Sequence, residues 1–301
     1  MTDRRSTVDR CALLACLLLL AACGGGGGGQ AAAPAAPAPP PGAAAPAPPP
    51  VPPAAGPAPA GYLLVWADEF DSPGLPDATR WGYDTERNRL GWWNNERQYY
   101  AAARWQNSVV ENGRLRITAR REALSTLPDW GGQAYSSARL ITRGKAAWTY
   151  GFFEIRAKMP CGTGTWPAIW MLGTGGVWPD DGEIDILEHV GRTPGEILGT
   201  VHTPTTGGSG NGSRTALPTA CTEFHDYQML WTADEIAIGV NGNVYHRYRN
   251  PRTGRAAWPF DAPQYLLLNI AVGGTLGGAV DDSIFPRTMD IEHVRVWQAA
   301  R

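Results

Sequence analysis

Alternation of apolar and polar side chains recurs after residue 61 and restricts the possible folds more than any other feature. Segments 114–120 (Arg-Leu-Arg-Ile-Thr-Ala-Arg) and 153–159 (Phe-Glu-Ile-Arg-Ala-Lys-Met) alternate almost perfectly. This pattern is typical of a strand with one buried face. Segment 265–272 instead reads as a fully buried strand with one polar residue, Asn269.

A hairpin is predicted at Asn241-Gly242-Asn243. This tripeptide separates two apolar alternations, 235–240 and 244–248, and Asn-Gly in such a position is a strong hairpin signal. No helical periodicity of useful length follows residue 61. The sequence therefore predicts an all-β domain, a sandwich or jelly roll, over residues 61–301.

The N-terminus has the pattern of an export signal. Arg4, Arg5 and Arg10 precede an apolar run, residues 11–22, which is too short to span a bilayer. The run ends in Leu-Ala-Ala-Cys23, which resembles a bacterial lipobox. We expect residues 1–23 to be a lipoprotein signal peptide with Cys23 lipidated; an ordinary secretory signal cut nearby is the alternative.

Residues 24–60 are almost entirely Gly, Ala and Pro, a composition that cannot bury a core and predicts a disordered linker. The expected protein is exported and anchored by lipid to a bacterial cell membrane or outer membrane, and otherwise periplasmic or extracellular. Membrane contact is expected only through Cys23, and we expect a monomer. The net charge of −2 and the lack of a basic cluster argue against a nucleic-acid partner.

Three carboxylates crowd into segment 181–189. In a strand Glu183 and Asp185 share one face, whereas strict alternation would bury Glu188 with the isoleucines of the other face, at a cost of several kcal/mol. A β-bulge at Ile186-Leu187 would return Glu188 to the face of the other two acids. The predicted strand then presents three acids in a row.

Such a row suits glycoside hydrolysis. Two glutamates leaning together could bring their carboxyls to about 5–5.5 Å, the separation that a retaining glycosidase needs. Three acids so close cannot all be ionised at neutral pH, so at least one pKa must rise. The alternatives are a solvated acidic loop or a calcium loop after residues 179–182. An inverted zinc motif fails on spacing, since Asp185 occupies its first position, and no Gly-x-Ser-x-Gly motif occurs.

Tryptophans in or beside predicted loops suggest a sugar-binding cleft. The chain has 13 tryptophans, and five of them, Trp92, Trp93, Trp166, Trp170 and Trp178, lie near Pro and Gly. Aromatic rings stack on the flat faces of sugars, although core packing is the alternative for any single one. Cys161 and Cys221 are the only cysteines after Cys23. In an exported domain we expect them to pair, which would contribute up to about 4 kcal/mol of stability.

These segments together resemble glycoside hydrolase family 16, the laminarinase-like β-glucanases. The resemblance runs through segments 66–70, 93–100, 164–171, 183–188, 201–203, 258–261 and 269–274, in family order. It implies a β-jelly-roll sandwich of two curved antiparallel sheets whose concave face is the cleft.

The resemblance also implies roles for single residues. Glu183 would be the nucleophile, Glu188 the acid/base and Asp185 the acid that tunes them, with no cofactor for catalysis. The implied substrate contacts are Trp93, Asn95, Trp166, Trp170, His202 and Asn269.

A structural calcium on the convex side is a further implication, with Glu69, the Gly113 carbonyl and Glu292 as ligands. Glu292 departs from the family pattern, where Asp is usual. Alternation places Glu292 on one face with Val294 and Val296, so its carboxylate needs a cation or a hydrogen-bond network. An arginine partner is the alternative to calcium.

We therefore expect a retaining endo-1,3-β-glucanase whose partner is β-glucan polysaccharide. A mixed-linkage β-1,3-1,4-glucanase or another family 16 polysaccharide hydrolase is the alternative within the family. A lectin-like glycan-binding module is the alternative from another class, but a binder has no use for three crowded carboxylates.

Overall fold

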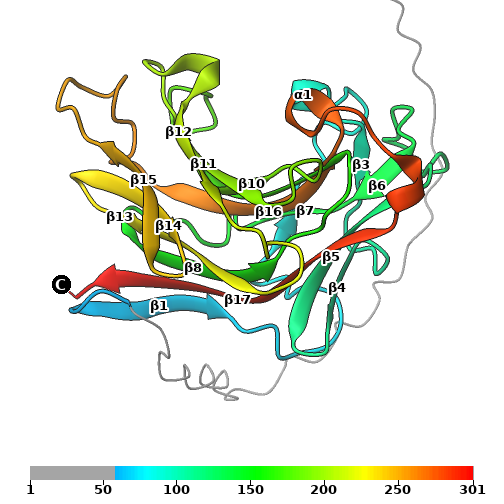
Figure 1. Ribbon diagram of the computed structural model, residues 1–301, viewed down its shortest axis with the longest axis horizontal. Coiled ribbons are helices and arrows are strands. Elements are labelled where there is room, and N and C mark those ends of the chain that lie inside the picture. Colours follow the sequence, from blue (N-terminus) through cyan, green and yellow to red (C-terminus); the bar gives the residue numbers. More distant parts are fainter. Residues whose placement is uncertain (1–57, 301) are drawn as a thin grey trace, which may run out of the picture. The chain divides into compact units, whose positions relative to one another are not determined.

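Two β-sheets lie one over the other in the computed structural model of the chain, which describes residues 58–300 (Figure 1). The predicted signal peptide, Cys23 and nearly all of the predicted linker lie outside the described residues. The all-β jelly-roll prediction is confirmed. Within residues 58–300, no helix is long and apolar enough to cross a membrane.

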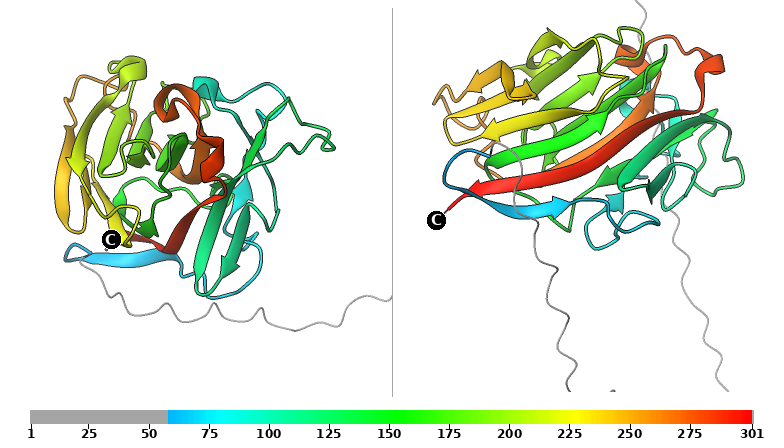
Figure 2. Two further views of the ribbon diagram at one scale, coloured as in Figure 1. Left: turned by 45° about the vertical axis from the view of Figure 1, so that its right-hand side comes forward. Right: turned by 60° about the horizontal axis from the view of Figure 1, so that its bottom comes forward.

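The outer sheet has ten strands in the order β15-β14-β13-β8-β17-β5-β6-β3, with β1 paired to β17 and β4 to β5. Figure 2 shows β1 and β17 side by side on this layer. Its strands are β1 (Tyr62–Asp68), β3 (Gln98–Tyr100), β4 (Ser108–Glu111), β5 (Arg114–Arg121), β6 (Tyr135–Ser137), β8 (Gly151–Lys158), β13 (His225–Trp231), β14 (Glu235–Val240), β15 (Asn243–Arg249) and β17 (Arg287–Ala299). All its pairs are antiparallel except β3 with β6.

The inner sheet has seven strands in the order β12-β11-β10-β9-β16-β7-β2, all antiparallel to their neighbours. They are β2 (Gly82–Tyr83), β7 (Arg139–Ile141), β9 (Thr165–Gly173), β10 (Glu183–His189), β11 (Glu196–His202), β12 (Asn211–Ala216) and β16 (Gln264–Val272). The described helices are single turns: η1 (Trp93–Asn95), η2 (Gly207–Ser209), α1 (Gly274–Gly277) and η3 (Asp282–Ile284).

The hydrophobic core lies between the two sheets. Ile155 and Met229 of the outer sheet are fully buried, as are Ile184, Leu187 and Leu268 of the inner sheet. The inward positions alternate with polar ones along β5, as its sequence predicts. Because the core takes one face of the inner sheet, the other face is free to carry a site.

The predicted hairpin is confirmed. Strands β14 and β15 pair antiparallel around Asn241 and Gly242, whose φ angles of 50° and 79° are both left-handed. Such a turn matches the twist of the two strands, and Asn and Gly are the residues that adopt it at low cost.

Strand β8 differs from the expected strand with one buried face. Glu154 is 2% exposed although it lies on the polar side of the alternation. It accepts a hydrogen bond of 2.7 Å from Gln228 Nε2 on β13 and lies 3.3 Å from His293 Nε2 on β17. Because β8 is a central strand, long side chains of both neighbours cover its polar face.

Cys161 and Cys221 form a disulfide, with 5.7 Å between their α-carbons. The predicted pairing is therefore confirmed. The bridge joins the segment that leads from β8 into β9 to the turn that precedes β13.

Candidate active site

A β-bulge in β10 brings the three acids to one face, as the sequence predicts. Asp185 lies opposite Trp170 of β9, but Leu187 already lies opposite Ile169, so one extra residue is inserted at Ile186. The register toward β11 shifts over the same residues. Ile184, Ile186 and Leu187 are fully buried in the core, and Glu183, Asp185 and Glu188 lie on the opposite face.

Each of the three acids has a hydrogen-bonding partner from a different segment: strand β9, strand β11 or the loop before β10. Trp166 Nε1 on β9 donates to Glu188 Oε1 at 3.0 Å. His202 Nε2 on β11 lies 3.2 Å from Asp185 Oδ2. In the loop before β10, Trp178 Nε1 donates to Glu183 Oε2. The site thus has defined orientations for all three carboxyls.

Burial and the repulsion between neighbouring carboxylates raise the pKa values of the three acids. Burial raises the pKa of Glu183, although the charge of His202 and the bond from Trp178 oppose the rise. The pKa of Asp185 is raised well above its usual range by burial and by the charges of Glu183 and Glu188. Burial and the charge of Glu183 raise the pKa of Glu188 to about 7.

His202 responds to the same acids. Burial alone would lower its pKa, but the hydrogen bond to Asp185 and the charges of Asp185 and Glu183 raise it to about 9. The three acids and His202 therefore hold more protons at neutral pH than they would separately in water. An acid that is still protonated near pH 7 can donate a proton to a leaving group.

Aromatic and polar side chains form a chain of hydrogen bonds on the β16 side of the acids. Trp170 Nε1 donates to Asn269 Oδ1 at 2.7 Å, and Asn269 Nδ2 donates to the Tyr100 hydroxyl at 3.0 Å. The Tyr100 hydroxyl donates in turn to Glu96 Oε2 at 3.3 Å. Asn269 is 4% exposed, so these bonds account for its place in an otherwise apolar strand.

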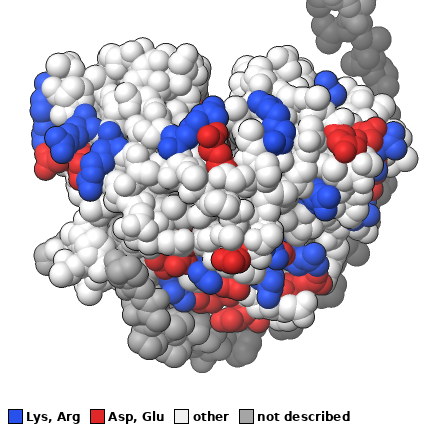
Figure 3. Space-filling view, viewed as in Figure 1, with Lys and Arg blue, Asp and Glu red and all other residues white. Residues whose placement is uncertain are grey.

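On the other side of the acids, over β11 and β12, the surface of the inner sheet is lined mainly by polar residues and glycines. A cavity of about 460 Å³ lies over β11 and β12. Its lining is Leu198, Thr200, Ser209, Gly210, Gly212, Ser213 and Arg214. Leu198 and Thr200 lie opposite Glu188 and Asp185 in the sheet register, so this cavity adjoins the acids. The space-filling view shows a hollow at the upper edge of the molecule (Figure 3).

Trp93 and Asn95 are exposed and lie at the rim, in η1. The Trp93 side chain is 61% exposed, and the Arg87 guanidinium lies 4.0 Å from the centre of its ring. A Cβ added to Gly274 of α1 would lie 2.9 Å from the Asn94 carbonyl oxygen and 3.4 Å from the Trp166 ring. The loop that carries Trp93 and Asn95 therefore comes close to Trp166.

Trp178 and Arg139 contact residues of the site, but the sequence assigned neither of them a role there. Trp178 was noted only as a loop tryptophan, and its bond to Glu183 depends on how residues 174–182 fold back. Arg139 is 6% exposed and pairs with Asp84 at 3.2 Å. Its guanidinium lies 4.6 Å from the ring centre of Trp170 and 5.2 Å from that of Trp92. No local sequence pattern marks an arginine that is stacked between distant tryptophans.

Of the three residues predicted to hold calcium, the two carboxylates, Glu69 and Glu292, have arginine partners instead, while Gly113 lies in the turn between β4 and β5 with a φ of 70°. Glu69 accepts two hydrogen bonds of 2.8 Å from Arg295, and Glu292 accepts one of 2.8 Å from Arg156. These ion pairs already balance both carboxylates, so this arrangement does not fit a calcium site. For Glu292 the arginine alternative is the one that the structure favours.

The expected face of Glu292 is also corrected. A register shift between Ile291 and His293 inserts a bulge in β17, so the inward positions change from Met289 and Ile291 to Val294 and Val296. Glu292 therefore does not share the buried face with the two valines, and its side chain is 34% exposed.

A sheet face that presents two glutamates, an aspartate between them and tryptophans that donate to both glutamates is the kind of site that a glycoside hydrolase uses. The comparisons with known proteins agree. The model for "Glycosyl hydrolases family 16" matches residues 95–290, and the chain belongs to this family.

Several relatives are similar over most of the chain. The β-glucanase of Rhodothermus marinus is 48% identical over 250 residues, which cover 78% of this chain and 85% of that protein. A solved non-specific endo-β-1,3(4)-glucanase of the family is 51% identical with a TM-score of 0.78, over 81% of this chain and 93% of that one. The laminarinase from Rhodothermus marinus is 47% identical with a TM-score of 0.75, over 80% and 98%.

Proposed function

We propose that this chain is an endo-acting β-glucanase that hydrolyses β-1,3-glucan with retention of configuration. The observation that carries the proposal is the bulged strand β10, which gathers Glu183, Asp185 and Glu188 on one face. The similarity to a β-glucanase and to a laminarinase supports the choice of substrate.

The reaction takes two displacements. In the first, the Glu183 carboxylate attacks the anomeric carbon while Glu188 gives its proton to the departing glycosidic oxygen, leaving a covalent glycosyl-enzyme. In the second, Glu188 takes a proton from water as that water attacks the same carbon and releases Glu183. The neighbouring Asp185–His202 pair favours the charged form of Glu183 when His202 is protonated.

Substrate binding is assigned to the aromatic side of the cleft and its rim. Trp166 and Trp170 would stack on sugar rings beside the acids, with Asn269 holding the Trp170 indole. Trp93 and Asn95 at the rim, and His202 beside Asp185, complete the proposed contacts. Although the Arg87 guanidinium lies over its ring, Trp93 is 61% exposed and so remains accessible to a sugar.

The linkage is tested by comparing rates on laminarin, lichenan, agarose and κ-carrageenan with the purified protein. We expect laminarin to be cleaved fastest. Cleavage of lichenan at a similar rate would place the protein with the non-specific endo-β-1,3(4)-glucanases that it is similar to. Faster cleavage of agarose or carrageenan than of laminarin would overturn the proposed substrate.

We also propose that the protein is exported as a lipoprotein, anchored at Cys23 through the linker 24–60, and that it acts as a monomer. The segment Leu-Ala-Ala-Cys23 after a short apolar run supports the anchor. The Cys161–Cys221 disulfide supports an oxidising compartment, since such bonds persist mainly in exported proteins.

A further inference from the structure

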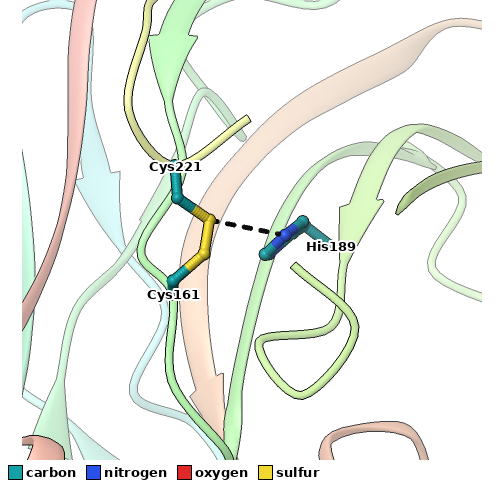
Figure 4. Close-up of side chains that lie close together, drawn as sticks. All are labelled: Cys161, His189 and Cys221. Atoms are coloured by element: carbon teal, nitrogen blue, oxygen red, sulfur yellow. Dashed lines mark hydrogen bonds between the residues drawn. A yellow bond between two sulfur atoms is a disulfide. The ribbon is translucent and has the colours of Figure 1, made fainter. Parts of the chain in front are cut away.

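The disulfide contacts the strand that carries the acids. Figure 4 shows His189, the last residue of β10, pointing toward the two sulfurs. Its Nε2 lies 3.8 Å from Cys221 Sγ and 3.1 Å from the Pro194 carbonyl oxygen. His189 is fully buried, whereas both cysteines are half-buried. A carbonyl oxygen only accepts, so the Nε2–H of His189 donates to Pro194.

The segment behind the disulfide is pressed against the end of β10. The Gly162 amide donates to the Gly191 carbonyl at 3.3 Å, and the Gly191 amide donates to the Thr165 carbonyl at 2.9 Å. A Cβ at Gly191 would lie 2.1 Å from the Gly162 carbonyl oxygen, so no side chain fits there. The segments 160–165 and 189–194 are therefore in direct backbone contact.

Each of the two segments in this contact is directly followed or preceded in the chain by a residue of the site. Glu188 precedes His189, and because successive side chains of a strand point to opposite faces, Glu188 enters the cleft where His189 turns to the disulfide. Trp166 follows Thr165 and donates to Glu188. The acid and its indole donor thus both adjoin the segments that the disulfide connects.

We propose that the Cys161–Cys221 disulfide and His189 form a brace that positions Glu188 against Trp166, so that opening the disulfide slows the step that needs proton donation. The inference rests on the role proposed above for Glu188. Opening requires a dithiol, which is oxidised to its cyclic disulfide while each cysteine gains one proton and one electron. His189 and the two cysteines are positioning residues and do not touch the substrate.

The test compares the full chain with the Cys161→Ser/Cys221→Ser double variant, well below the melting temperature of both. Laminarin needs a protonated Glu188, whereas a 2,4-dinitrophenyl β-laminaribioside has a leaving group that departs without a proton. We expect the double variant, and the wild type after reduction with a dithiol, to lose about tenfold in kcat on laminarin, as for a small displacement of a catalytic group. The loss in glycosyl-enzyme formation from the aryl substrate should be less than about twofold.

Control variants separate the brace from ordinary stability. Met289→Ala removes a fully buried side chain from the outer sheet and should lower the melting temperature without changing the ratio of the two rates. His189→Leu should behave like the double cysteine variant, whereas His189→Gln, which keeps an N–H for Pro194, should recover most of the laminarin activity. If the double variant loses only thermal stability and keeps the wild-type ratio, the disulfide is a stabiliser and the brace is overturned.

Hydrogen exchange measured by mass spectrometry tests the brace without any substrate. The double variant should exchange faster in segments 160–166 and 188–194 than the wild type, with strands β14 and β15 unchanged. No difference, or a uniform increase, would overturn the brace. A wild type with no activity on any β-glucan would instead overturn the proposed function, and the exchange result would still decide the brace.

Discussion

Glu188 is subject to opposing influences on its pKa. Burial and the charge of Glu183 raise it, while the hydrogen bond from Trp166 and the charges of His202 and Arg214 lower it, with a result of about 7. A general acid must carry its proton, so activity falls as the pH rises through this pKa. We predict that kcat/KM on laminarin has its alkaline limb near pH 7, because this ratio reports the free enzyme.

The Trp166→Phe variant should move that limb. The indole N–H stabilises the charged carboxylate, so its loss raises the pKa of Glu188 by about one unit, the size of a hydrogen bond to a charged group. The measurement is the pH profile of kcat/KM for both proteins, and kcat/KM itself should also fall because a stacking surface changes. A wild-type alkaline limb near pH 5 would contradict this account of Glu188.

The two glutamates should respond differently to replacement. Without its acid, Glu188→Ala should still form the glycosyl-enzyme from substrates with good leaving groups, and azide should restore turnover. Glu183→Ala should lose the covalent intermediate, and azide could then attack from the vacated side. Proton NMR of the glycosyl azides should show opposite anomers for the two variants. The same anomer from both would mean that the roles are misassigned.

Among the strands and turns, the sequence predicted those features that are determined by residues close together in the chain. The bulge in β10 followed from a single cost, since strict alternation would have put Glu188 in the core. The Asn241-Gly242 turn likewise follows from the φ angles that these two residues adopt. In both cases the identity of the residues and their positions along the chain were sufficient to predict the local structure.

The rest depended on contacts between distant segments. No residue pattern predicts the bulge in β17. With or without a bulge at Glu292, alternation places apolar residues on the buried face, so the sequence does not distinguish the two arrangements. Arg139 finds Asp84, Trp92 and Trp170 only after three separate strands and loops assemble. Glu154 is buried by the neighbours that the sheet order gives to β8. Alternation of polar and apolar residues identifies a strand, but it does not indicate which strands will be its neighbours in the sheet.

The ion pairs that β17 makes with its neighbours give a prediction about calcium. Both carboxylates are neutralised by ion pairs: Glu69 pairs with Arg295, and Glu292 pairs with Arg156. We therefore expect the melting temperature to be the same with a chelator and with added calcium. Calcium bound only to the native state would raise stability by about 2.7 kcal/mol at a hundredfold excess over its dissociation constant. A clear fall in melting temperature on chelation would restore calcium to this face.

At the scale of the whole chain, the proposed anchor separates where the protein is held from where it acts. A lipidated Cys23 followed by the linker would tether the domain to a membrane, and two or three acyl chains suffice for stable attachment. We predict that the full chain is recovered in membrane fractions and that Cys23→Ser moves it to the soluble periplasm or the medium, with unchanged activity on laminarin. Equal soluble amounts of both forms would contradict lipidation.

The most direct test of the proposed chemistry is proton NMR of laminarin during hydrolysis by the wild-type protein. Two displacements at one carbon restore the β configuration, so the anomeric signal of new reducing ends should first appear as β and become α only as mutarotation proceeds. Shorter laminari-oligosaccharides should accumulate with that signal. Reducing ends that first appear as α would contradict a nucleophilic Glu183 and the double displacement.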